Sequence, residues 1–414
     1  MEKGKSEQKN DYNPAILYED FEDVGYYIGN TGKIFISPTK KLRNIYPLLY
    51  ENANIIRAQY NAQKGKGDRA EIKRFNDNLN ENLADLYDML RNETYVPGEY
   101  RIKIIHEPKE RVIMIAPFYP DRIVHHCIIN VLGKHWHHIF IGNTYACIKG
   151  RGIHKCMEDV HRALITDRAG TRYCLKIDIR KFYDNVDHSA LKRIVRYTIA
   201  DEQMLRLLDK IIDSNGKAKG LPIGNFTSQY LANLYLAYFD HWAKEVLGVE
   251  HYFRYMDDIV VLGASKEWLH YVLDAFGLYL GAELKVEIKP NWQIFPVDDR
   301  SIDYVGFKQN HYGILLRKGI LLRFYEKMEK TRKKYEIKDE NDIKHLFPSE
   351  YGWIVRCSKE HSSFIFNQCL NNGKKQCIEY RPDIQRKARS YRRSQERPRH
   401  HSLQSQHQGG ACGD

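Results

Sequence analysis

The sequence lacks long apolar runs, paired cysteines and internal repeats. No apolar stretch approaches membrane-spanning length, and the first ten residues hold no apolar core of the signal-peptide kind. The eight cysteines are scattered without a Cys-x-x-Cys pair, which is typical of free thiols in a reducing compartment. These absences argue against membrane, disulfide-scaffold and repeat proteins, and they favour a cytoplasmic protein with no membrane partner.

A recognisable zinc signature is missing as well. Histidine and cysteine gather in residues 125–127 (His-His-Cys) and 135–138 (His-Trp-His-His), but their spacing matches no common zinc motif. A structural zinc ion at these residues is therefore a disfavoured alternative.

Positive charge is in excess. The net charge is +12 and the pI about 9.1, a balance that favours a polyanionic partner. Residues 374–399 hold ten Lys or Arg against three acids and few apolar residues, so this tail is expected to stay disordered until it meets a partner. A solvated tail without a partner is the alternative.

The hydrophobic pattern changes period several times along the chain. A 3.6-residue period predicts helices, and alternation or short apolar runs predict strands. The predicted helices are 42–64, 69–91, 120–131, 230–246 and 266–280, with more than one helix within 189–213 and several within 323–371. The predicted strands are 100–106, 111–116, 173–179, a hairpin within 251–263, a strand region at 289–297, and a hairpin of 302–308 with 313–316.

Acidic residues interrupt two of these strands. The hairpin at 251–263 turns at Tyr255-Met256-Asp257-Asp258, without the Gly or Asn that tight hairpin turns prefer. Asp178 lies in the apolar strand 173–179, where a carboxylate costs several kcal/mol unless it is paired or bound to a cation. An ordinary acidic turn is the alternative for the hairpin taken alone.

A loop rich in turn residues, 220–229, lies between the two acidic strands and leads into a helix. Backbone N–H groups at a helix start can hold phosphate. Nucleotidyl transfer needs two cations about 3.5–4 Å apart, held by carboxylates. Asp178, Asp257 and Asp258 together with this loop therefore predict a nucleotidyl-transfer site.

Five motifs, in the same order along the chain, resemble those of reverse transcriptases. Residues 253–261 (Phe-Arg-Tyr-Met-Asp-Asp-Ile-Val-Val) resemble the signature hairpin, and 176–188 the first palm motif of bacterial and group II intron enzymes. Residues 221–224 (Leu-Pro-Ile-Gly) are similar to Leu-Pro-Gln-Gly, 107–111 to the finger hairpin, and 304–307 (Tyr-Val-Gly-Phe) to the primer-grip region. The resemblance covers residues 40–320.

The resemblance implies an α+β, right-hand polymerase fold with fingers, a palm of antiparallel sheet plus helices, and a small helical thumb. The expected parts are an N-terminal extension (1–40), fingers with part of the palm (41–172), palm (173–315, with a fingers insertion at about 190–220), thumb (316–372) and basic tail (373–414). The implied activity is RNA-directed DNA polymerisation with template RNA, a DNA or RNA primer and dNTPs.

The resemblance also implies roles for individual residues. Asp178, Asp257 and Asp258, with the backbone carbonyl of Ile179, would hold two Mg²⁺ ions, for which Mn²⁺ can substitute. The residues that would contact the incoming nucleotide are Lys109, Arg111, Tyr183 (as a steric gate against the ribose 2′-hydroxyl), Ile223, Gly224, Asn225, Gln229 and Lys289. The residues that would steady primer and template are Tyr255, Met256, Tyr304, Gly306 and Phe307.

The basic side chains of the finger hairpin could contact phosphate. The alternative is that they only keep a solvated strand edge charged, which prevents aggregation. For Tyr183 the alternative is a packed core side chain.

Departures from the common pattern indicate one branch of the family. Ile223 and Asn225 stand in the Leu-Pro-Gln-Gly region, and Ser-Gln229 replaces Ser-Pro. This version, with residues 145–154, resembles reverse transcriptases of diversity-generating retroelements, which are bacterial or phage-encoded. The resemblance implies misincorporation opposite template adenine and a small basic accessory protein oligomer as partner.

Two other interpretations stay open. One is a group II intron-like or phage-defence reverse transcriptase of ordinary fidelity, although no His-Asn-His endonuclease residues are recognisable. The other is a catalytically idle RNA-binding scaffold. Such a scaffold would have no physical need for three mutually repelling carboxylates.

Overall fold

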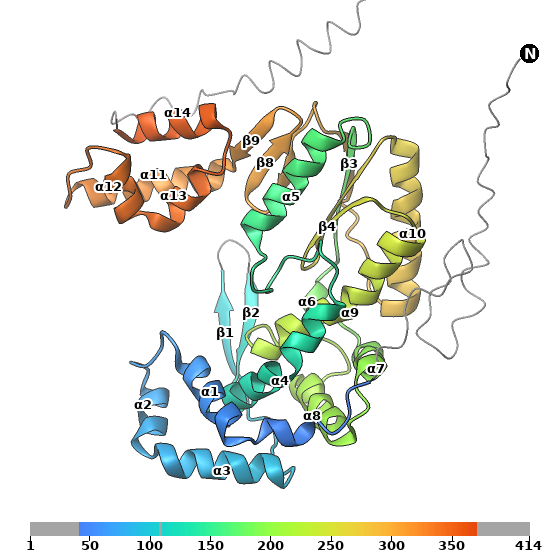
Figure 1. Cartoon of the computed structure of the whole chain (residues 1–414), viewed down its shortest axis with the longest axis vertical. Coiled ribbons are helices and arrows are strands. Elements are labelled where there is room, and N and C mark those ends of the chain that lie inside the picture. The colour runs from blue at the N-terminus through green and yellow to red at the C-terminus, as the bar shows by residue number, and fades with distance from the viewer. Residues whose placement is uncertain (1–40, 107–109, 371–414) are drawn as a thin grey trace, which may run out of the picture. The chain divides into compact units, whose positions relative to one another are not determined.

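A computed structural model describes residues 41–106 and 110–370 of the chain (Figure 1). The predicted N-terminal extension, Lys109 and the basic tail lie outside the described residues. Close packing divides the described chain into two units. The first holds residues 41–152, 175–262 and 267–293, and the second holds 153–174, 263–266 and 294–370. The predicted boundaries of fingers, palm and thumb stay a prediction.

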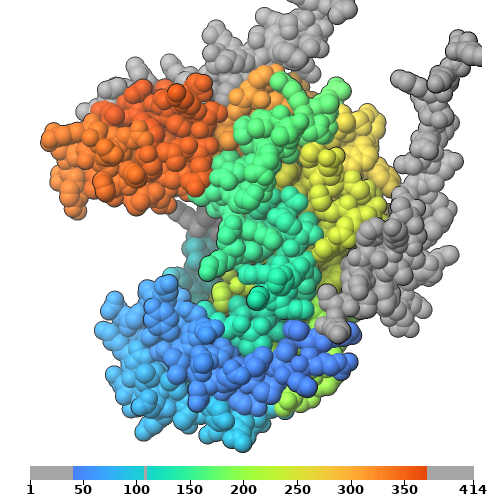
Figure 2. Space-filling model, viewed as in Figure 1, coloured from blue at the N-terminus to red at the C-terminus, as the bar shows by residue number. Residues whose placement is uncertain are grey.

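Helices make up most of the first unit. They are α1 (Asn52–Gln63), α2 (Ala70–Asp77), α3 (Leu79–Arg91), α4 (Ile123–Ile139), α6 (Phe182–Asn185), α7 (His188–Thr198), α8 (Glu202–Ile212), α9 (Phe226–His241) and α10 (Lys266–Leu284). The apolar helix α4 packs against both α1 and α9. The blue surface in Figure 2 is formed by the first described residues together with α1–α3. The aspartates that precede α7 and α8 cap them, since the side chains of Asp187 and Asp201 accept backbone N–H groups of the first turn.

Several predicted helix boundaries are wrong. The predicted helix 42–64 begins only at Asn52. The predicted helix 69–91 is broken at Asn78, whose non-helical backbone (φ −123°, ψ 45°) separates α2 from α3. Helix α4 continues to Ile139, beyond the predicted end at Val131, because its last turns bury Leu132 and Trp136. Helix α9 begins at Phe226, four residues earlier than predicted, so Gln229 is helical rather than part of the loop.

Antiparallel pairing dominates the sheets. In the first unit β1 (Arg101–Ile105) and β2 (Arg111–Ile115) form a two-stranded ribbon, with Arg101 opposite Ile115. The strands β4 (His251–Tyr255) and β5 (Asp258–Gly263) form a hairpin with Tyr255 opposite Asp258, and β3 (Tyr173–Asp178) follows β5 in the same sheet. A fourth strand, β6 (Gln293–Pro296), comes after β3 in the order β4-β5-β3-β6. The mixture of helices with antiparallel sheets confirms the predicted α+β class.

The second unit combines a small sheet with helices. Its sheet consists of β7 (Ile302–Tyr304), β8 (Phe307–Asn310) and β9 (Gly313–Leu316), in that order. Its helices are α5 (Ile153–Thr166), α11 (Lys318–Arg332), α12 (Glu340–Leu346), α13 (Pro348–Ile354) and α14 (Lys359–Leu370). The predicted continuous strand 302–308 is wrong, because Val305 (φ +43°) and Gly306 (φ +90°) turn the chain between β7 and β8. The predicted helical segment after residue 323 is confirmed over 323–370.

In the part of the chain that the structure describes, every helix is too short or too polar to cross a lipid bilayer.

Candidate active site

The turn between β4 and β5 places two aspartates at one end of the central sheet. Met256 has a left-handed backbone (φ +55°), which is uncommon for a residue with a side chain and is typical of functional sites. Both carbonyl groups of the turn are held from outside it. The carbonyl of Asp257 accepts a hydrogen bond from the backbone N–H of Ile179 (3.2 Å), and that of Met256 accepts one from the Arg254 guanidinium (3.0 Å).

Asp178, at the end of β3, meets Asp257 side chain to side chain. Burial, and then the neighbouring charge of Asp178, raises the pKa of Asp257 to about 6. Burial also raises the pKa of Asp258 to about 6, although Lys176 opposes this shift. Carboxylates that are this costly to ionise in the metal-free protein are suited to a cation, which would remove their mutual repulsion.

Two lysines flank these carboxylates. The ammonium group of Lys289 lies 2.5 Å from Asp178 Oδ1, and that of Lys176 lies 3.6 Å from Asp258 Oδ2. The backbone N–H of Lys289 also donates to the Asp178 carbonyl (2.8 Å). In the metal-free protein these two ammonium groups supply the positive charge next to the carboxylates. Carboxylate oxygens are the ligands that a hard divalent cation prefers, although Asp178, Asp257 and Asp258 are not among the groups of three converging ligand atoms in the described residues.

Tyr183 lies beside the same turn. It belongs to the short helix α6, which Lys181 begins with a left-handed backbone (φ +44°). The Tyr183 hydroxyl contacts the Met256 sulfur at 3.8 Å, and burial raises the pKa of this phenol. The aromatic ring is therefore fixed next to the aspartate-bearing turn.

The Leu-Pro-Ile-Gly segment lies against the β1–β2 ribbon. The Ile223 carbonyl accepts a hydrogen bond from the backbone N–H of Met114 in β2 (2.9 Å). At Gly224 (φ +133°) a Cβ atom would lie 2.5 Å from the Met114 carbonyl oxygen, so only glycine fits. Asn225 is buried at the start of α9, but its amide donates to the Tyr100 hydroxyl (2.7 Å) instead of capping the helix.

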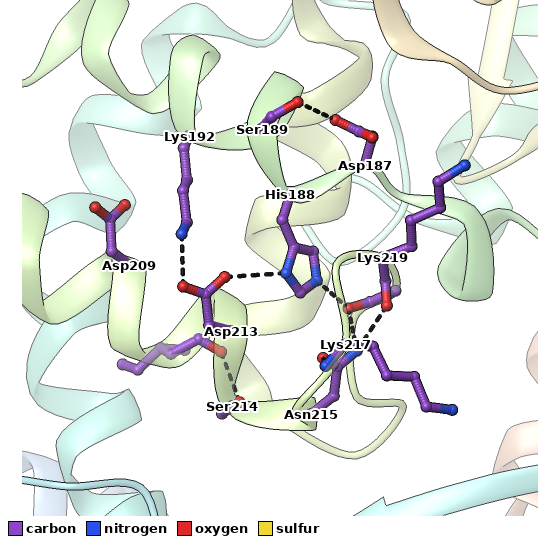
Figure 3. A network of polar contacts seen from close by, with 12 residues as sticks. Asp187, His188, Ser189, Lys192, Asp209, Asp213, Ser214, Asn215, Lys217 and Lys219 are labelled. Atoms are coloured by element: carbon purple, nitrogen blue, oxygen red, sulfur yellow. Dashed lines mark hydrogen bonds and ion pairs between the residues drawn. The ribbon is translucent and has the colours of Figure 1, made fainter.

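A polar network holds the loop that leads into this segment (Figure 3). The buried ring of His188 contacts Asp213 Oδ1 (3.0 Å) and the Gly220 carbonyl (2.8 Å). Asn215 donates to the same carbonyl (2.7 Å), and Lys192 pairs with Asp213 (2.5 Å). The network ties α7 to the end of α8 and fixes the loop just before Leu221.

The turn predicted to steady the primer lies in the second unit. Tyr304 and Phe307 are fully buried at its two ends. Gly306 lies directly under the indole of Trp353, since a Cβ atom there would come within 2.5 Å of that ring. The same indole stacks on Phe307, with ring centroids 5.0 Å apart. The turn is thus packed against α13.

The structure brings several predicted site residues together and leaves others apart. Asp178, Ile179, Asp257, Asp258 and Lys289 gather at one end of the sheet. Among the residues predicted to contact the nucleotide, Arg111 is exposed at the start of β2 and Gln229 is exposed on α9. Ile223 and Gly224 contact Met114 of β2, and Asn225 contacts Tyr100.

Two residues with direct contacts to the site were missed by the sequence analysis. Lys176 and Arg254 are basic residues inside apolar strands. The cost of an unpaired charge in such a strand is the signal that could have identified both. The histidines and cysteine of α4 belong to none of the groups of three or more candidate metal ligands among the described residues.

The site thus consists of paired carboxylates at one end of a sheet, with two lysines and Tyr183 beside them. Residues 106–309 match the family model of reverse transcriptases (RNA-dependent DNA polymerases). This segment, just under half of the chain, is similar to a reverse transcriptase domain. Members of this family generally use divalent metal ions.

Two curated relatives are similar over part of the chain. The group II intron-encoded protein LtrA of Lactococcus lactis is 22% identical over 176 residues, which is 40% of this chain and 29% of LtrA. Protein YkfC of Escherichia coli is 27% identical over 174 residues, which is 39% of this chain and 45% of YkfC. The matches thus span less than half the length of each relative. A solved structure of apo telomerase from Candida tropicalis aligns with 72% of this chain and 59% of its own, at 12% identity and a TM-score of 0.43.

Proposed function

We propose that this protein is an RNA-directed DNA polymerase that copies a template RNA into cDNA, with misincorporation at template adenines that diversifies a target gene. The observation that supports the polymerase proposal is the approach of the Asp178 and Asp257 carboxylates, with the pKa of Asp257 raised to about 6, within a segment that matches the family model of reverse transcriptases. Template RNA, a primer and dNTPs are the proposed substrates. A small basic accessory protein oligomer is the proposed partner.

The proposed chemistry divides between bound cations and side chains. Two Mg²⁺ ions, when bound by Asp178, Asp257, Asp258 and the Ile179 carbonyl, would activate the primer 3′-hydroxyl and neutralise the triphosphate. Lys289, whose ammonium group lies beside Asp178, would contact the triphosphate. Tyr183 would hold the deoxyribose by excluding a 2′-hydroxyl.

The mutagenic part of the proposal depends on the segment 223–225. The Ile223 backbone is fixed on β2 by its hydrogen bond to Met114, so its half-buried side chain has a defined place beside the ribbon. An isoleucine offers no hydrogen bond there, whereas the glutamine common in the family does. Losing one polar contact would cost about 1–3 kcal/mol of discrimination between correct and incorrect pairs.

Primer extension on RNA templates that differ only in one adenine tests this proposal. The wild type is expected to misincorporate opposite adenine more often than opposite the other bases. The Ile223→Gln variant is expected to reduce this error about tenfold or more, with Ile223→Leu as the matched apolar control. Unchanged errors in Ile223→Gln would overturn the mutagenic role of residue 223, and uniformly low errors in the wild type would favour a polymerase of ordinary fidelity.

A further inference from the structure

The guanidinium of Arg254 is the most deeply buried charge near the catalytic turn. Arg254 lies in β4, two residues before Met256, and its side chain and that of its ion-pair partner Asp240 are both 0% exposed. Asp240 belongs to α9, the helix that follows the Leu-Pro-Ile-Gly segment. A buried ion pair of this kind is costly to desolvate, so its presence is by itself weak evidence for a gain in stability.

All five N–H donors of this guanidinium have acceptors. Nε and one Nη2 hydrogen go to the two carboxylate oxygens of Asp240 (2.7 and 2.5 Å). The other Nη2 hydrogen reaches the Asn233 carbonyl (3.4 Å), and Nη1 reaches the Asn233 side-chain oxygen (3.2 Å). The remaining Nη1 hydrogen donates to the Met256 carbonyl (3.0 Å). The planar guanidinium thus connects α9 to the β4–β5 turn in one fixed orientation.

The Asp240 carboxylate is also fixed by further hydrogen bonds. It accepts these from the hydroxyls of Tyr252 (2.6 Å) and Thr144 (3.0 Å). The Arg254 backbone is fixed too, because its N–H donates to Asn143 and its carbonyl accepts from Tyr145. The guanidinium therefore has little freedom to move away from the turn.

From this geometry we infer that Arg254 is a positioning residue, which aims the Asp257 carboxylate by holding the Met256 carbonyl and so keeping Met256 in its left-handed conformation. Arg254 acts through the backbone of the turn, by its hydrogen bond to the Met256 carbonyl. The inference rests on the proposed function in that Asp257 is taken as a ligand of the catalytic cation. Without this hydrogen bond the turn would relax, and the carboxylate would meet the cation in fewer of its conformations.

The test compares variants that each remove a different hydrogen bond of the group formed by Arg254, Asp240 and Tyr252. Arg254→Lys keeps the charge but cannot reach all five acceptors, and Asp240→Asn leaves the arginine in place while weakening its orientation. Tyr252→Phe is the matched buried control, because it removes a hydrogen bond to Asp240 and leaves the bond to Met256 intact. Arg196→Lys is a distant control in the ion pair with Asp209.

Two measurements are made on each full-length variant: the Mg²⁺ concentration that gives half-maximal primer extension, and the affinity for Mn²⁺ without substrates, followed by electron paramagnetic resonance. We expect Arg254→Lys to raise the half-maximal Mg²⁺ concentration and to lower the Mn²⁺ affinity, each about fivefold or more. Asp240→Asn should change both quantities in the same directions by a smaller factor. Both controls should leave the two quantities unchanged, while Tyr252→Phe lowers the melting temperature. If Arg254→Lys does not fold, Asp240→Asn carries the test.

The outcomes separate this inference from the proposed function. Wild-type metal dependence in a folded Arg254→Lys variant would overturn the positioning role, and so would an equal shift in Tyr252→Phe. A wild type that binds Mn²⁺ through the turn but extends no primer would overturn the polymerase proposal. In that case weaker Mn²⁺ binding by Arg254→Lys would still support the positioning role.

Discussion

Replacing Asp257 by asparagine is expected to stabilise the metal-free protein while abolishing polymerisation. The folded-state pKa of Asp257 is about 6, against an ordinary value of 3.8, so ionising this carboxylate is harder in the folded than in the unfolded chain. A difference of about two pKa units corresponds to about 3 kcal/mol. Because the side chain is partly exposed, solvent screening reduces the expected gain to about 1 kcal/mol.

The sign of this effect sets its pH window. The folded state holds the proton more tightly, so the cost of the ionised carboxylate is fully present above about pH 6 and disappears as the pH falls to about 4. Asp257→Asn should therefore melt about 1–2 °C above the wild type at pH 8 in EDTA, and at the same temperature near pH 4.

Differential scanning fluorimetry of both proteins across this pH range measures the effect. Asp209→Asn, which only breaks the ion pair with Arg196, is the matched control and should not raise the melting temperature. Added Mg²⁺ should stabilise the wild type and not the variant. A lower melting temperature of Asp257→Asn at pH 8, or a gain that is independent of pH, would refute the reasoning.

Three further substitutions test the packing around the site. Gly224→Ala would force a Cβ atom against the Met114 carbonyl, so we expect lower activity and a loss of about 1–3 kcal/mol of stability by denaturant unfolding; a variant with wild-type values would contradict the close approach. Gly306→Ala would collide with the Trp353 ring and should lower the melting temperature, and an unchanged melting temperature would argue against that contact. Tyr183→Val should raise ribonucleotide incorporation about tenfold or more relative to deoxyribonucleotide in primer extension, and an unchanged ratio would assign Tyr183 to packing alone.

The acidic residues of the site could be predicted because each breaks a strong local pattern. Asp178 interrupts an apolar strand, and Asp257 and Asp258 occupy a turn that lacks glycine and asparagine. The structure places Met256 of that turn in the left-handed conformation, which is the local compromise that the missing glycine implied. Local chemistry was therefore sufficient to find the carboxylates.

The partners of these residues could not be predicted in the same way. Lys176 meets Asp258 only because β3 lies next to β5, and Arg254 meets Asp240 only because α9 packs under β4. Such pairings depend on tertiary arrangement and leave no spacing in the sequence. The start of α9 was missed for a related reason, since Asn225 reaches Tyr100 and does not cap the helix. Likewise, a β-branched residue such as Val305 is not a typical signal for the turn that it helps to form.

Primer extension on a defined RNA template, with dNTPs and Mg²⁺, tests the central claim most directly. Wild type and Asp257→Ala are compared at equal concentration, after circular dichroism has shown that both are folded. We predict templated cDNA from the wild type, none from Asp257→Ala, and none from the wild type in EDTA. Equal extension by both proteins, or none by either in the presence of Mg²⁺, would contradict the assignment of this chain as an RNA-directed DNA polymerase.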